Sequence, residues 1–145
     1  MLLLVVLVLH AAAVWFCTGL VWVVQVLVYP GFAGLDRASF TAWHDRHTRL
    51  MAWTVSGPWA VQGVTTAVLL VWRPDGVPFW AAALAGVCGA ATVAVTVLVS
   101  VPCHRRLSAG YDDEVLTRLV VTNRWRVLAW TAGGLVAAGM LVAAA

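Results

Sequence analysis

Apolar residues fill four long runs along the chain, and shorter polar stretches separate them. The runs cover about residues 2–28, 50–72, 78–101 and 120–142. At 1.5 Å per residue, about 20 helical residues cross the hydrocarbon of a bilayer, so each run is long enough to span it. The pattern predicts an all-α fold: a single-domain integral membrane four-helix bundle over residues 1–145, with both termini on the same side.

The polar stretches predict how the spans are joined. After Tyr29 and Pro30 the chain is too polar for lipid, but from about Asp36 it has a helical pattern that we expect to run into the second span. Pro58, in the middle of that span, predicts a kink because proline removes one backbone donor. The RPDG sequence at 73–76 predicts the turn that ends it.

The second half of the chain follows the same plan. The small residues Ala82, Gly86 and Ala90 lie one turn apart in the third span, which predicts close helix packing. The segment PCHRRLSAGYDDE, residues 102–114, is expected to be a loop. A helix is predicted from about 113 to 142, and its first turns are polar, so it should project beyond the membrane.

Composition narrows the class of protein. Hydrophobic residues make up 63% of the chain and charged residues 10%, which excludes an ordinary soluble domain. The net charge of +3 does not indicate nucleic-acid binding. The first run lacks a basic start and an A-x-A site that is followed by a polar segment, so we expect it to remain as a helix. Cys17, Cys88 and Cys103 fall in or beside apolar runs and are expected to be free thiols.

The arginines predict orientation. Eight of the nine lie in or next to the first and third connections, and only Arg73 lies in the second. We expect the chain to lie in the plasma membrane. By the positive-inside rule, its arginine-rich connections face the cytoplasm and both termini face outward.

Three histidines belong to the same membrane face as these arginines. His44 and His47 are spaced i, i+3 on a predicted helix, and His104 follows the third span. With Asp112, they could bind one transition metal, either iron, copper or zinc. Without a metal, the same groups could act as general acid and base. The sequence leaves both mechanisms open, with His44, His47, His104, Asp112 and Arg126 as the candidate catalytic residues.

Other polar residues could bind a substrate beside the histidines. Arg126 should lie deepest among the helix-four residues, and an arginine near hydrocarbon normally pairs with an acid or faces a polar cavity. The predicted substrate-binding residues surround it: Gln25, Tyr29, Asn123 and Trp130. His10 lies several turns away on the outward side, and we expect it to make a hydrogen bond between helices.

These motifs resemble a family of small, uncharacterised bacterial four-span membrane proteins. The resemblance rests on Tyr29-Pro30 with Phe32, on His44 and His47, on Pro102 with His104, and on Asn123 with Arg126, although Arg124 stands where that family has tryptophan. More distantly, the layout is similar to the anthrone oxygenase-like membrane family. That resemblance implies an enzyme acting on small hydrophobic molecules, and the lysine-free composition is typical of high-GC bacteria, where such chemistry often serves secondary metabolism.

The leading hypothesis is therefore a membrane-embedded enzyme that takes a lipophilic small molecule from membrane lipid and transforms it at the cytoplasmic face by oxidative or acid–base chemistry. The alternative is a non-catalytic membrane subunit that binds haem or quinone through two of the histidines. A transporter is less favoured, because the sequence lacks an inverted repeat. The substrate and the oligomeric state are left open.

Overall fold

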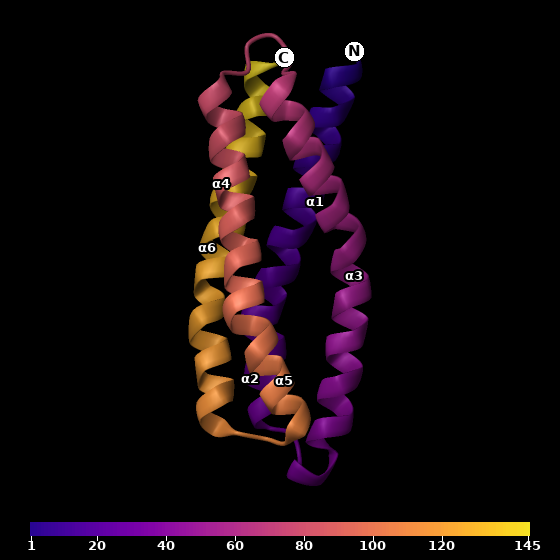
Figure 1. Ribbon diagram of the computed structural model, residues 1–145, viewed down its shortest axis with the longest axis vertical. Helices are drawn as coiled ribbons and strands as arrows, with labels where there is room; N and C mark the ends of the chain where they lie inside the picture. Colours follow the sequence, from indigo (N-terminus) through magenta and orange to yellow (C-terminus); the bar gives the residue numbers. More distant parts are fainter.

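The computed structural model describes residues 1–145 as four long helical rods that form an antiparallel bundle (Figure 1). Both termini lie at one end of the bundle, and the two arginine-rich connections lie at the other. All four rods are long and apolar enough to cross a membrane. Large apolar side chains are exposed around the bundle, as expected for helices that face lipid. The predicted multi-pass four-helix architecture is confirmed.

Two of the rods are single helices and two are composite. The elements in chain order are α1 (Leu2–Val23), a π-helical turn η1 (Val24–Val28), α2 (Tyr29–Ala33), α3 (Arg37–Val71), α4 (Phe79–Val95), a second π-helical turn η2 (Thr96–Ser100), α5 (Val101–Ala109) and α6 (Asp113–Ala143).

The connections partly correct the sequence predictions. Asp36 caps α3 by accepting a hydrogen bond from the amide of Ala38, as the expected helix start requires. The loop predicted over 102–114 is wrong, because the chain stays helical to Ala109. Proline fits the first turn of a helix, where no backbone donor is needed, and Leu107 is fully buried on the inner face of α5.

The two π-helical turns are an unpredicted feature with a shared cause. Each one ends two residues before a proline, Pro30 or Pro102. The proline ring has no amide hydrogen and collides with the carbonyl four residues earlier, and a wider turn accommodates both effects. Since each π turn inserts one residue, later side chains are rotated by about 100° around the rod. Tyr29 is 2% exposed as a result of facing the bundle interior.

Pro58 does not interrupt α3, which is continuous through it. The α3 ribbon changes direction about half-way along its length, as the proline predicts (Figure 1). Thr65 of α3 is tied to α1 near the terminal end of the bundle, where its hydroxyl lies 3.1 Å from Nδ1 of His10. This is the helix-to-helix hydrogen bond that the sequence predicted for His10.

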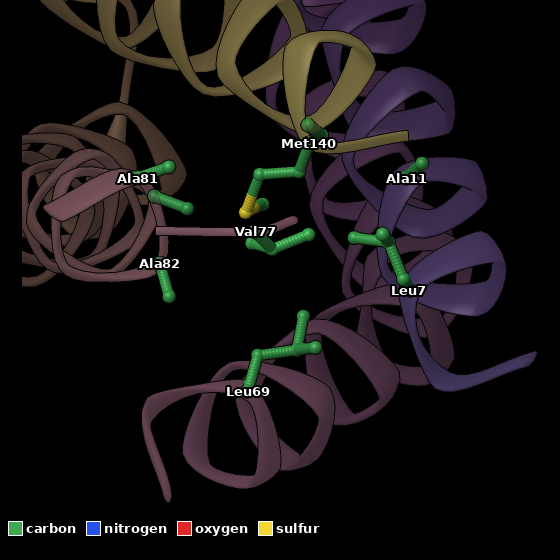
Figure 2. Close-up of a cluster of buried hydrophobic side chains, with 9 residues drawn as sticks. Leu7, Ala11, Leu69, Val77, Ala81, Ala82 and Met140 are labelled. Carbon is green, nitrogen blue, oxygen red and sulfur yellow. The ribbon is translucent and has the colours of Figure 1, made fainter. Parts of the chain in front are cut away.

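A compact apolar core closes the terminal end of the bundle. Side chains from all four rods meet there, and Figure 2 shows Leu7, Leu69, Val77 and Met140 pointing toward one another. Ala82, from the small-residue stripe, belongs to this core. The predicted packing role holds for Ala82, whereas Gly86 is half-buried, Ala90 is exposed, and both line a groove beside α3.

Gly76 ends the turn between α3 and α4 and has no substitute there. Its φ of +82° lies in the left-handed region, and a Cβ atom would collide with the carbonyl of Ala143. We predict that Gly76→Ala destabilises the protein by at least about 1–2 kcal/mol. Thermal unfolding in detergent measures this, with Gly63→Ala as the control because open space surrounds Gly63. Equal unfolding temperatures for the two variants would contradict the prediction.

Candidate functional site

A cavity of about 500 Å³ lies at the arginine-rich end of the bundle, between α3 and the segments around the two π turns. Its volume is that of a site for a small organic molecule. One part of its wall is polar and contains hydroxyl, imidazole and guanidinium groups. The rest is apolar. The residues that line it include Tyr29, His47, Met51, Val55, Trp59, Thr96, Ser100, His104, Arg105, Ser108 and Arg126.

A chain of hydrogen bonds runs from this cavity into the protein. The hydroxyl of Tyr29 lies 3.3 Å from Nε2 of His104, and Nδ1 of His104 lies 3.0 Å from Nε2 of His44. One imidazole must donate and the other accept, so the facing nitrogens of the pair carry a single proton between them. His44 does not line the cavity and is fully buried behind His104.

The far end of this chain reaches the aqueous face. Nδ1 of His44 lies 3.4 Å from the hydroxyl of Ser108 and 3.8 Å from a carboxylate oxygen of Asp45. The Asp45 side chain is 48% exposed, so this end of the chain lies close to the surface of the bundle. The donor and acceptor roles along this chain depend on the tautomers of the two imidazoles, and one consistent arrangement has Tyr29 donating to His104 and His104 donating to His44.

Aromatic packing holds the imidazoles in place. Phe32 is fully buried, and its ring meets those of His44 and His47 edge-on at centroid distances of 5.6 and 5.1 Å. His47 stacks on Trp43 at 5.8 Å, and its ring lies 6.4 Å from that of His104. The three predicted histidines therefore gather at one end of the bundle, with His47 and His104 on the cavity wall.

A second row of polar side chains fixes Arg126 from behind. The amide nitrogen of Asn123 donates to Oε1 of Gln25 at 2.9 Å, and Nη1 of Arg126 donates to Oδ1 of Asn123 at 3.0 Å. Asn123 is fully buried, and none of the ion pairs in the structure involves Arg126. The guanidinium thus reaches the cavity with its charge unneutralised.

Two predicted site residues lie apart from the cavity. Asp112 caps α6 by accepting from the amides of Glu114 and Val115, and it pairs with Arg106 at 3.2 Å. Asp112 therefore lies where it stabilises the start of α6. Trp130 is buried in an apolar cluster with its ring centroid 6.5 Å from that of Trp59, below Arg126.

Sequence reasoning missed three residues of the site. Ser108 lies four residues after His104, and this helical spacing could have indicated it had 102–114 been recognised as helix. Asp45 is adjacent to His44 in sequence and was passed over. Ser100 carries no sequence signal, because its placement depends on the π turn that ends with it.

The donor geometry favours a hydrogen-bonded cluster over a metal centre. His44 and His104 turn nitrogens toward each other at hydrogen-bond distance, and no group of three or more His, Cys, Asp or Glu side chains is arranged to hold a metal ion. Metal binding by His44, His47 and His104 stays a prediction.

Comparisons with protein-family models, with curated proteins and with solved structures found no match to this chain. Function must therefore be argued from the site itself.

The row behind Arg126 yields a stability prediction. In Asn123→Leu, Oε1 of Gln25 and Nη1 of Arg126 lose their hydrogen-bond partner, which costs about 1–3 kcal/mol per group. We expect a lower unfolding temperature in detergent than for wild type. The control is Thr122→Val, next in the chain, whose hydroxyl bonds only to its own helix. Equal unfolding temperatures of Asn123→Leu and Thr122→Val would contradict the prediction that the hydrogen bonds of Asn123 stabilise the fold.

Proposed function

We propose that this protein is a membrane-embedded enzyme that transfers a proton to or from a small lipophilic molecule at the cytoplasmic face of the plasma membrane. The orientation follows from the positive-inside rule, which places the arginine-rich end, and hence the cavity, toward the cytoplasm. The observation that carries the proposal is the chain Tyr29–His104–His44, which begins on the cavity wall and ends beside the half-exposed Asp45.

The cavity suits a substrate that arrives from lipid. Its apolar wall is formed largely by α3, where Ala52 is exposed and Met51, Val55 and Trp59 are half-buried, so few side chains separate the cavity from the surface of the bundle. Burial of apolar substrate surface against this wall supplies binding energy of about 25 cal/mol per Å². An apolar substrate bound against this wall displaces water from it, which strengthens the polar interactions opposite it.

The chain supports removal of a proton from the substrate. The breaking bond, either O–H or C–H next to a carbonyl, leaves its electron pair on the substrate. The proton moves to Nε2 of His104 directly, or it moves to the Tyr29 oxygen while Tyr29 passes its own hydroxyl proton to Nε2 of His104. The proton on Nδ1 of His104 then passes to Nε2 of His44, and the one on Nδ1 of His44 passes toward Asp45. Run in reverse, the same chain delivers a proton from water.

This role explains why two imidazoles are used in series. One histidine on the cavity wall could accept a proton but would have to return it to the same substrate. His44 is fully buried, so it cannot exchange with the cavity directly. Asp45, which lies 3.8 Å from Nδ1 of His44 and does not line the cavity, gives the accepted proton a separate exit. Such proton removal is an acid–base reaction in itself and the usual first step of oxidation of phenols and enols.

Turnover tests the proposal. The protein, in nanodiscs, is incubated with an apolar extract of cells that produce it, and mass spectrometry follows the compounds consumed. We predict that His104→Ala and His44→Ala abolish the conversion that wild type performs, because each cuts the chain. The control is His10→Ala, whose histidine lies at the other end of the bundle and should leave turnover intact. Conversion of the same compound by His104→Ala and His44→Ala would contradict the proposal.

A substrate-free measurement tests the relay itself. In protein labelled with ¹⁵N-histidine, we predict a ¹⁵N–¹⁵N coupling across the hydrogen bond between His104 Nδ1 and His44 Nε2, and its loss in either alanine variant. Elemental analysis of the same samples addresses the metal. Stoichiometric iron, copper or zinc that disappears in His44→Ala, together with absence of the coupling, would replace the relay with a metal centre.

A further inference from the structure

Unsatisfied polar atoms are concentrated at this cavity. Only three buried side-chain polar atoms in the whole chain lack a hydrogen-bond partner within the protein: Nε2 of His10, Oγ of Ser100 and Nε of Arg126. The latter two belong to residues that line the cavity. A buried polar atom without a partner destabilises a fold, so native proteins keep few of them, and those they keep need an explanation.

Ser100 Oγ and Arg126 Nε can each donate a hydrogen bond, and both atoms are buried within residues that line the cavity. Ser100 is 2% exposed, and its hydroxyl has no carbonyl partner, unlike that of Thr96 on the same π turn, which donates to the Thr92 carbonyl at 2.7 Å. Arg126 donates through Nη1 to Asn123, which leaves the edge formed by Nε and Nη2 for another acceptor. That edge of a guanidinium matches the two oxygens of a carboxylate.

The charge around the cavity has one sign. Arg126 and Arg105 both line it, and no aspartate or glutamate does. The nearest acid described above, Asp45, lies behind His44 rather than on the wall. A hydrogen-bond acceptor that binds in this cavity is therefore favoured if it is anionic.

The apolar wall continues away from these donors. Trp59 borders the cavity and also a second groove of about 210 Å³ between α3 and α4, which is lined with small residues such as Gly63, Gly86 and Gly89. A chain or ring system attached to the anionic group thus has room in the direction of the membrane centre.

We propose that the cavity binds an amphiphilic carboxylate, with the carboxylate held by Ser100 Oγ and the Nε edge of Arg126 and the apolar body against Trp59 and Val55. This assignment names the substrate class of the proposed enzyme and rests on that proposed function. It places the acid group of the ligand on the same cavity wall as Tyr29 and His104, which leaves the adjoining part of the molecule next to the proton relay.

Binding without turnover tests this class. Isothermal titration calorimetry in an uncharged detergent compares decanoate with decanol and with acetate. We expect decanoate to bind at least about tenfold more tightly than decanol, since a charge-assisted bidentate hydrogen bond is lost in the alcohol. Acetate should show no binding at the same concentrations. Equal affinity of decanol and decanoate would overturn the assignment.

Matched variants locate the binding site. Ser100→Ala removes an unsatisfied hydroxyl, so we expect it to weaken decanoate binding about three- to tenfold while raising the unfolding temperature by about 2–4 °C. Thr92→Val removes a buried hydroxyl that donates to the carbonyl of Gly89 at 2.7 Å and does not line the cavity, so it should lower the unfolding temperature and leave the affinity unchanged. A loss of affinity in Thr92→Val as large as in Ser100→Ala would contradict the role of Ser100.

A third variant tests the charge of Arg126 without removing it. Asn123→Asp keeps the acceptor of Nη1 but adds an internal carboxylate, and Gln25 can turn its amide to donate to it. Decanoate binding should fall at least about tenfold, because the guanidinium is then neutralised. Arg106→Gln, on the exposed rim and paired with Asp112, should bind as wild type does.

The two proposals fail separately. If the protein binds decanoate more tightly than decanol but His104→Ala and His44→Ala remain active on the cell extract, the carboxylate assignment is supported and the proton relay is contradicted. If those variants are inactive and decanoate binds no more tightly than decanol, the proton relay is supported and the carboxylate assignment is contradicted. Unchanged decanoate affinity in both Ser100→Ala and Asn123→Asp would place its binding elsewhere and would also overturn the assignment.

Discussion

A charged side chain in an apolar bundle must be held by the protein itself, because lipid offers no hydrogen bonds. Here Gln25 of the first rod holds Asn123 of the last, and Asn123 holds Arg126. This row joins the rods that are farthest apart in sequence at the level of the cavity. It sets the depth of the guanidinium, and the cavity in front of it owes its positive charge to the fact that the row contains amides and no acid.

The two proline-linked π turns determine what else faces the cavity. Each adds a residue to its rod just before the site, and each also makes the wall irregular where regular helices would pack together. Tyr29 follows the first turn, while Ser100 ends the second and His104 follows it. The terminal half of the bundle, which has no such turns, closes into a tight core around Leu7 and Met140. The difference between the two ends therefore begins with backbone geometry.

The sequence predicted the four rods, the helix start at Asp36 and the common location of the three histidines, since hydrophobic period, capping chemistry and alternating direction are all local or topological. It did not predict that His104 lies on a helix, because proline and two arginines were interpreted as a loop. Ser100 and the pairing of His44 with His104 depend on the rotation introduced by a π turn and on which nitrogen faces which, and neither is encoded in spacing.

In the proposed function, the α3 side of the cavity meets lipid and the half-exposed Asp45 meets water, so the two ends of the proposed site lie in different solvents. A molecule dissolved in the bilayer is present there at a mole fraction set by its partitioning, whereas the proton activity is that of the aqueous phase. The degree of saturation of the site therefore follows the ratio of ligand to lipid and not the ligand per litre of suspension. Adding empty membrane dilutes the ligand seen by the protein, even though the volume and the pH of the sample do not change.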